Sequence, residues 1–133
     1  MNKENISTTA QSQIEFFSGE NGNEYTERNK DNLENCGADI IYNSVKMSKS
    51  KSVLEVGCGV GNNLSRIHDI CKITGVDINK LALETAQKKY PNGKFVESSL
   101  YTLPFPDNSF DFVFTRGVLI HIPPADRLKA LEE

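Results

Sequence analysis

Several features are absent from this 133-residue sequence, and each absence argues against a class of function. No apolar run approaches the roughly 20 residues that a helix needs to cross a membrane. Residues 1–13 are predominantly polar, so no secretory leader is recognisable. The net charge is −3, which gives no electrostatic basis for binding nucleic acid or an acidic membrane. We therefore expect a cytoplasmic protein whose partners are neither nucleic acids nor membranes.

Cysteine is also scarce. The three cysteines, Cys36, Cys58 and Cys71, are odd in number and lack the paired spacing of metal ligands. We expect no bound metal, and reduced thiols as is usual in the cytoplasm. The sequence contains neither internal repeats nor low-complexity segments. Its length predicts one domain, large enough for a hydrophobic core but small for an α/β enzyme.

Residues 52–64 combine the features of a nucleotide-type binding corner. The stretch begins as an apolar, β-branched segment typical of a buried parallel strand, which ends abruptly in glycine. Gly57, Gly59 and Gly61 then allow a tight turn and keep Cβ atoms away from a ligand. A helix is predicted to begin at Asn62, so that its free backbone N–H groups point back into the loop.

The spacing of these glycines distinguishes two classes of nucleotide-binding protein. A dinucleotide fingerprint, G-x-G-x-x-G, would place its third glycine or alanine at Asn62, whereas here it falls one residue earlier, at Gly61. Glu55 lies two residues before the first glycine. A second apolar strand, residues 73–76, ends at Asp77, where a carboxylate can accept hydrogen bonds from both ribose hydroxyls. This E-x-G-x-G-x-G pattern with Asp77 resembles class I methyltransferases that use S-adenosylmethionine.

The order of the elements predicts an α/β protein, a Rossmann-like three-layer sandwich with N-terminal helices. Strands that alternate with helices in short units indicate a parallel sheet with right-handed crossovers. We expect the strand order 3-2-1-4, with the ligand crevice where the order reverses. Residues 1–9 are expected to fray. The predicted strands are residues 52–56, 73–76, 94–97 and 112–115; the predicted helices are one that ends at Gly19, one over 32–47, one that starts at Asn62, one capped by Asn79 and one over 125–133.

The chain is interpreted as two parts. Residues 1–48 form an N-terminal helical cap or lid, and residues 49–133 form the N-terminal portion of a cofactor-binding core. Folds of this type normally continue beyond the fourth strand, so we expect the sequence to be part, or a shortened relative, of a longer protein. The fourth strand would then be an exposed apolar edge, which is a template for pairing with another chain. We expect self-association through this strand, marginal stability and poor turnover.

The resemblance to class I methyltransferases covers most of residues 52–124 and implies S-adenosylmethionine as cofactor. Residues 103–111 and 117–123 look like the segments on either side of the fourth strand in small-molecule methyltransferases. Residues 16–29, together with this ending, are similar to methyltransferases associated with pseudaminic acid biosynthesis, which implies a small, sugar-like acceptor. The resemblance implies cofactor contacts at Tyr25, Arg28, Glu55, Gly57, Cys58, Gly59, Gly61, Asn62, Asn63, Asp77, Ile78, Ser99, Leu100, Thr115, Arg116 and Gly117.

Residues 19–29 are polar and rich in glycine, yet they carry Tyr25 and Arg28 three residues apart. In a helix these two side chains share a face. The segment is either the start of a surface helix or a lid over the cofactor pocket. As a lid, it would use Arg28 to hold the carboxylate of the cofactor, since a guanidinium matches a carboxylate with two parallel hydrogen bonds.

Two further site predictions concern the residues that recognise adenine and the residue that removes a proton from the acceptor. Members of the broad class often carry an acid after the third strand, where this sequence has Ser98 and Ser99 followed by Leu100. Adenine would then be held by a serine hydroxyl, the Leu100 backbone N–H and apolar packing. His121, just past the fourth strand, is the candidate general base for an acceptor that must lose a proton. A histidine that packs the loop or caps a helix is the alternative.

Two other functions stay under consideration. A truncated, non-catalytic module would keep the S-adenosylmethionine site but lack the acceptor pocket. A nicotinamide-dependent oxidoreductase is disfavoured by the glycine spacing and by the absence of a second catalytic domain. A comparison of cofactor binding with turnover distinguishes the three.

Overall fold

The computed structural model describes residues 6–33 and 37–133, which fold around a four-stranded parallel sheet. The strands lie in the order β3-β2-β1-β4, and each neighbouring pair is parallel. This confirms the predicted Rossmann-like sheet and its strand order. The strands are β1 (Ser52–Val56), β2 (Lys72–Asp77), β3 (Lys94–Glu97) and β4 (Phe112–Phe114).

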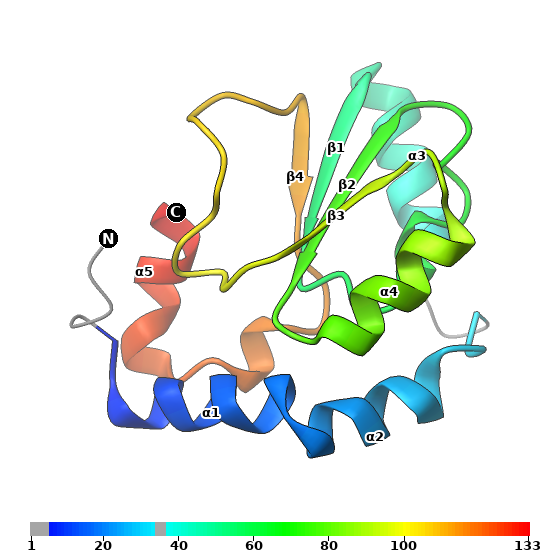
Figure 1. Cartoon of the computed structure of the whole chain (residues 1–133). Helices are drawn as coiled ribbons and strands as arrows, with labels where there is room; N and C mark the ends of the chain where they lie inside the picture. The colour runs from blue at the N-terminus through cyan, green and yellow to red at the C-terminus, as the bar shows by residue number, and fades with distance from the viewer. Residues whose placement is uncertain (1–5, 34–36) are drawn as a thin grey trace.

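Helices cover the sheet and its carboxyl edge. Figure 1 shows α1 and α2 end to end beneath the carboxyl ends of the strands. No helix within residues 6–33 and 37–133 is both long enough and apolar enough to cross a membrane. The α-helices are α1 (Thr8–Ser18), α2 (Glu20–Asn29), α3 (Ala38–Ser48), α4 (Lys80–Lys89) and α5 (Arg127–Glu132), and the 3-10 turns are η2 (Asn62–Leu64), η3 (Leu119–His121) and η4 (Pro124–Asp126).

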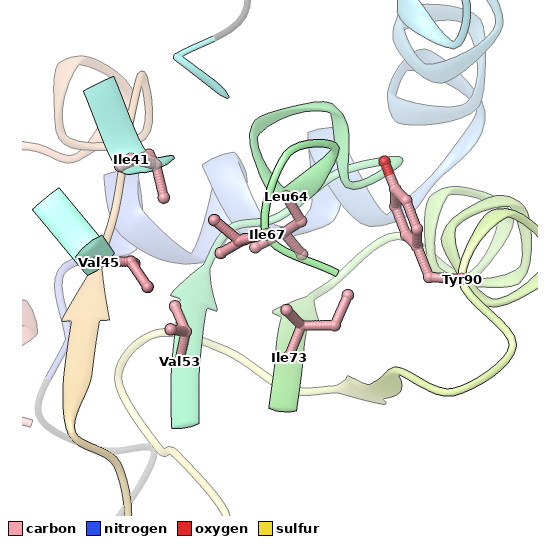
Figure 2. Packing of buried hydrophobic residues seen from close by; sticks show 7 residues of the cluster. All are labelled: Ile41, Val45, Val53, Leu64, Ile67, Ile73 and Tyr90. Carbon is pink, nitrogen blue, oxygen red and sulfur yellow. The ribbon is translucent and has the colours of Figure 1, made fainter. Parts of the chain in front are cut away.

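The main hydrophobic core lies between the sheet and α3. Successive strand residues point to opposite faces, so Val53 of β1 and Ile73 of β2 share the face beneath the segment that follows the glycine loop. Burying one such side chain stabilises the fold by about 1.5–3 kcal/mol. Figure 2 shows the cluster, whose members are Ile41, Val45, Val53, Leu64, Ile67, Ile73 and Tyr90.

The opposite face of the sheet borders a groove of about 470 Å³. Leu54 and Val113 point into it, together with Phe105, Phe110 and Leu131. Val113 is 55% exposed, and its strand β4 is an edge strand of the described sheet. Self-association through this edge stays a prediction.

Two predicted helices are wrong in part. The segment after the glycine loop forms the 3-10 turn η2 and further turns instead of an α-helix, because the side chains of Asn62 and Asn63 bond to other segments rather than to the segment's own first turn. The helix predicted over residues 32–47 begins only at Ala38, since Gly37 is a poor helix former and its N–H donates to Asn63 Oδ1. Cys36 lies outside the described residues.

The N-terminal helix begins earlier than predicted. Ser7 caps α1, with its hydroxyl accepting from the Ala10 N–H, so the expected fraying does not reach residues 7–9. Residues 1–5 lie outside the described part of the chain. The predicted caps at Gly19 and Asn79 are confirmed. The predicted C-terminal helix is η4 followed by α5.

Gly61 joins the glycine loop to the core. Its φ of +79° lies in the left-handed region, and its carbonyl accepts a hydrogen bond of 2.9 Å from the hydroxyl of Tyr90. A Cβ at this position would lie 2.8 Å from the Tyr90 ring. At Gly59, where φ is +53°, a Cβ would meet nothing within 4 Å.

This contrast predicts unequal effects of two alanine substitutions on stability. Both Gly59→Ala and Gly61→Ala add the strain of a left-handed alanine, about 1–2 kcal/mol. Gly61→Ala also forces the buried Tyr90 ring to move, so we expect it to lower the free energy of unfolding by at least 1 kcal/mol more, roughly the cost of overpacking. Urea denaturation of both variants measures this difference, and equal losses would contradict the packing described here.

Candidate cofactor site

A covered cavity of about 320 Å³ lies at the carboxyl edge of the sheet. Its floor is the glycine loop after β1, together with Asp77 at the end of β2. Its sides are formed by residues 98–101 after β3 and residues 116–118 after β4. Helices α1 and α2 cover it, with Gly22, Tyr25 and Thr26 among the lining residues. The topology therefore gathers four loops and two helices around one space.

Most of the predicted site residues meet at this cavity. The predicted cofactor residues that line it are Tyr25, Gly57, Cys58, Gly59, Asn62, Asn63, Asp77, Ile78, Ser99, Leu100, Arg116 and Gly117. His121, the candidate base, also lines it. The predicted residues that are not part of the lining are Arg28, Glu55, Gly61 and Thr115.

Asp77 binds the backbone on both sides of the cavity floor. Its Oδ2 accepts from the Gly59 N–H at 2.8 Å, and its Oδ1 accepts from the Asn79 N–H at 2.9 Å. Burial raises the pKa of this carboxyl, while these backbone hydrogen bonds act in the opposite direction. Each carboxylate oxygen has a second lone pair, so Asp77 can still accept from a diol in the cavity.

Gly59 leaves its side of the loop open. Because a Cβ there would meet no atom within 4 Å, the peptide at Gly59 is accessible to a ligand that lies across the loop. Its N–H is already bound to Asp77, so the loop has a fixed shape before any ligand arrives. A preformed loop lowers the entropy that binding costs.

Glu55 supports the loop from beneath. It is fully buried, and its Oε1 accepts from Asn63 Nδ2 at 2.6 Å. Asn63 Oδ1 in turn accepts from the Gly37 N–H at 2.6 Å, which connects β1 to the start of α3. Glu55 Oε2 has no hydrogen-bond partner among the described residues. Burial raises the pKa of Glu55 to about 8; the hydrogen bond from Asn63 opposes this shift and the nearby Asp77 adds to it.

Cys58 lies in the glycine loop as a buried thiol. Burial raises its pKa well above the ordinary value, and the charges of Asp77 and Glu55 act in the same direction. The thiol therefore stays protonated at neutral pH and is a poor nucleophile. A Cβ added at Gly75 would lie 2.6 Å from the Cys58 Sγ, so the thiol packs tightly against β2.

Of Tyr25 and Arg28, the two residues predicted to contact the cofactor from a lid, only Tyr25 lines the cavity. The inner face of α2 follows Gly22, Thr26 and Asn29, all of which line the cavity. Tyr25 borders this face and reaches the cavity, whereas Arg28 projects elsewhere on the helix and is exposed. Helical spacing explains this, because Arg28 lies about 200° around the axis from Thr26. The structure thus supports a covering role for residues 19–29 but does not bring Arg28 to the cavity.

Aromatic rings form one wall of the cavity. The ring of Phe17 lies 4.9 Å from that of His121 and 6.2 Å from that of Tyr25. These rings come from α1, α2 and η3, so they meet only in the folded chain. Gln13 adds an amide group beside them. A wall of this kind suits a ligand with an apolar face and a few hydrogen-bonding groups.

The segment after β3 offers neutral polar groups. Ser99 Oγ accepts from the Tyr101 N–H at 3.2 Å, and Ser98 Oγ donates to the Thr102 carbonyl at 2.6 Å. Both serines and Leu100 line the cavity. Within the described ranges, no group of three or more His, Cys, Asp or Glu residues is arranged to hold a metal.

Sequence reasoning recognised Asn79 only as a helix cap. Its buried amide also donates to the Phe17 carbonyl at 3.0 Å and to Asn23 Oδ1 at 2.9 Å, which fastens the α1–α2 cover to the start of α4. Its position two residues after Asp77 is the sequence feature that could have indicated this second role. Phe17 and Asn29 also line the cavity and lie in residues 16–29, which carry the family resemblance, but they were not predicted as site residues. Gln13 lines it as well, and no local pattern distinguishes Gln13 from an ordinary surface residue.

Together, the parallel sheet, the glycine loop and the acid after β2 define a Rossmann-like protein with a nucleotide-type site at the carboxyl edge. A family model described as a methyltransferase domain matches residues 53–133. That range is more than half of the chain, so the chain belongs to the methyltransferase-domain family.

Individual relatives agree with this family. The chain is 33% identical over 100 residues to a demethylmenaquinone methyltransferase of Staphylococcus aureus, which covers 70% of this chain and 41% of the relative. It is 33% identical over 91 residues to a sterol 24-C-methyltransferase of Gibberella zeae, covering 62% of this chain and 24% of the relative. The chain thus spans less than half the length of either relative.

A solved structure shows the same fold over nearly the whole chain. Magnesium protoporphyrin IX methyltransferase from Synechocystis PCC 6803, crystallised with bound S-adenosylmethionine, superposes with a TM-score of 0.73 at 19% identity. The match covers 98% of this chain and 71% of that chain, so it includes the α1–α2 cover as well as the sheet.

The raised pKa of Glu55 predicts how stability depends on pH. The folded chain keeps a proton on Glu55 up to about pH 8, whereas the unfolded chain releases it near the ordinary pKa of about 4.3. The free energy of unfolding should therefore fall as pH rises from 5 to 8, by up to about 1.4 kcal/mol per pH unit. Glu55→Gln keeps an acceptor for Asn63 and cannot titrate, so we expect a shallower fall.

Urea denaturation of both proteins at pH 5, 6, 7 and 8 measures this slope. The shift at Asp77 acts in the same direction but is common to both proteins. A variant whose stability falls as steeply as that of the parent chain would show that Glu55 is already ionised in the folded state.

Proposed function

We propose that this chain binds S-adenosylmethionine in the covered cavity and transfers its methyl group to a small metabolite. The observation that carries this proposal is the joint placement of Gly59 and Asp77. They come from the ends of neighbouring strands, are hydrogen-bonded to each other at 2.8 Å, and line the same cavity. Membership of the methyltransferase-domain family supports the same assignment.

The cavity residues fit the parts of this cofactor. Asp77 accepts hydrogen bonds from the ribose hydroxyls, and Ile78 and Leu100 provide apolar surfaces for the adenine. The Ser99 hydroxyl and the Leu100 N–H replace the acid that other members use at this position. Arg116 lines the cavity beside the glycine loop, where its guanidinium can hold the cofactor carboxylate in place of Arg28.

The cofactor supplies a methyl group on a positively charged sulfur, so the chain has little covalent chemistry to perform. Its main contribution is to align the acceptor with that methyl group and to exclude water. The aromatic wall of Phe17, Tyr25 and His121 faces the space left for the acceptor. His121 accepts the proton when the reacting group is a hydroxyl or a protonated amine.

The acceptor is proposed to be sugar-like. An apolar wall with the Gln13 amide and the His121 ring suits a sugar, which has both apolar faces and hydroxyl groups. A sugar of the pseudaminic acid pathway is the narrower form of this proposal and rests on the resemblance in residues 16–29. The family membership supports methyl transfer without indicating this sugar.

Asp77→Asn tests the cofactor assignment. The substitution keeps the shape of the side chain but replaces one carboxylate oxygen with an NH2 group. It therefore removes the charged acceptor from the ribose site and one of the two backbone hydrogen bonds that Asp77 accepts. We expect S-adenosylhomocysteine to bind about 10- to 100-fold more weakly, which corresponds to the loss of about 1.5–3 kcal/mol from a hydrogen bond to a charged group. Isothermal titration calorimetry measures the dissociation constant, and circular dichroism checks that the fold is retained.

Asp69→Asn is the matched control, because Asp69 is exposed and lies away from the cavity. If Asp77→Asn and Asp69→Asn bound S-adenosylhomocysteine equally well, Asp77 would have no part in cofactor binding. A methyl-transfer assay on the same proteins distinguishes an enzyme from a module that only binds the cofactor.

A further inference from the structure

Helix α2 covers the cavity, yet hydrophobic packing does not hold it there. Its buried residues are Gly22 and Thr26, neither of which has a large apolar side chain. Tyr25, its one aromatic residue, is 48% exposed. The helix must therefore be held mainly by hydrogen bonds at its two ends, and these ends differ in their exposure to solvent.

Asn79 holds the N-terminal part of α2 through hydrogen bonds, which form the first fastening. The Asn79 amide donates to the Phe17 carbonyl and to Asn23 Oδ1, and its Oδ1 accepts from the Thr26 hydroxyl at 3.4 Å. Asn79 is 4% exposed, and a Cβ at Gly22 would lie 2.9 Å from its amide nitrogen. If this end opened, the buried amide would lose its partners in a place that water does not readily reach.

Asn62 and Lys89 hold the C-terminal end of α2 through hydrogen bonds, which form the second fastening. Asn62 Nδ2 donates to the carbonyls of Asn29 and Asn32 at 3.0 and 3.2 Å. Lys89 Nζ donates to the Lys30 carbonyl at 2.7 Å and to Asn62 Oδ1 at 2.8 Å. These bonds are largely exposed, so water can replace them when they break.

We propose that α2 is a strap that opens at its Asn62–Lys89 end to let the cofactor in and out, while its Asn79 end stays closed as the hinge. Of the lining residues, Thr26 is bonded to Asn79 at the hinge, whereas Asn29 and Asn32 are bonded to Asn62 at the end that opens. Release of the exposed end therefore uncovers the cavity above the glycine loop. Asn62 directly follows Gly61, so this fastening is attached to the loop itself.

Lys89→Met tests the strap on the unliganded chain. The substitution removes the ammonium group but keeps most of the apolar stem. We expect amide hydrogen exchange over residues 26–33 to become about three- to tenfold faster, the effect of one or two exposed hydrogen bonds. Exchange over residues 8–18 and 79–86 should be unchanged. Lys88→Met removes the same charge from an exposed neighbour on α4 and should leave exchange over residues 26–33 unchanged.

The second measurement rests on the proposed function and uses stopped-flow binding of S-adenosylhomocysteine. The Lys89 hydrogen bonds are present in the closed state both with and without ligand. Their loss should therefore accelerate association and dissociation alike, each about three- to tenfold. The dissociation constant should stay within about twofold of the parent value, because both rates change together. Asn79→Ser keeps a hydroxyl to cap α4 but lacks the amide. It should raise the dissociation constant instead, because the hinge is lost.

These outcomes separate the two proposals. Failure of the parent chain to bind S-adenosylhomocysteine would contradict the proposed cofactor, and hydrogen exchange would still test the strap. Unchanged exchange over residues 26–33 in Lys89→Met, or exchange that increases over the whole chain, would overturn the strap. Faster dissociation without faster association would also overturn it.

Discussion

The structure of the site depends on the hydrogen bonds that converge on the end of β2. Asp77 fixes the glycine loop through the Gly59 N–H and fixes the start of α4 through the Asn79 N–H. The side chain of Asn79 then holds the junction of α1 and α2. One carboxylate therefore positions the floor of the cavity directly and its cover through the next hydrogen-bonded residue. This explains how a short, polar helix such as α2 can close a binding cavity with little hydrophobic burial.

Glu55 of β1 provides a second support for the glycine loop. A fully buried carboxyl is costly when charged, and the protein lowers that cost by keeping Glu55 protonated to about pH 8 and by hydrogen-bonding it to Asn63. Asn63 also holds the N–H of Gly37 and so determines where α3 can begin. The floor of the site is thus tied to the start of α3 through Asn63 and to the end of α2 through Asn62, and the loop keeps its shape without a ligand.

The sequence predicted those parts of the fold that local chemistry determines. Strand β1, the turn at Gly57–Gly61 and the acid at Asp77 follow from apolar runs, glycine and a charged strand end. It did not predict the start of α3 or the turns after Asn62, because side chains from distant segments compete there with the helix. The wall formed by Phe17 and His121 is a contact across more than a hundred residues. Arg28 was expected at the cavity because it shares a turn with Tyr25, but the inner face of α2 is set by how closely Gly22 approaches Asn79.

The central claim is that the cavity beneath α2 is the cofactor site, and a crystal structure of the chain with S-adenosylhomocysteine tests it most directly. We expect the ribose hydroxyls within hydrogen-bonding distance of the Asp77 carboxylate, the adenine between Ile78 and Leu100, and α2 closed over the ligand. A ligand bound elsewhere, or bound in this cavity without contact to Asp77, would contradict the account.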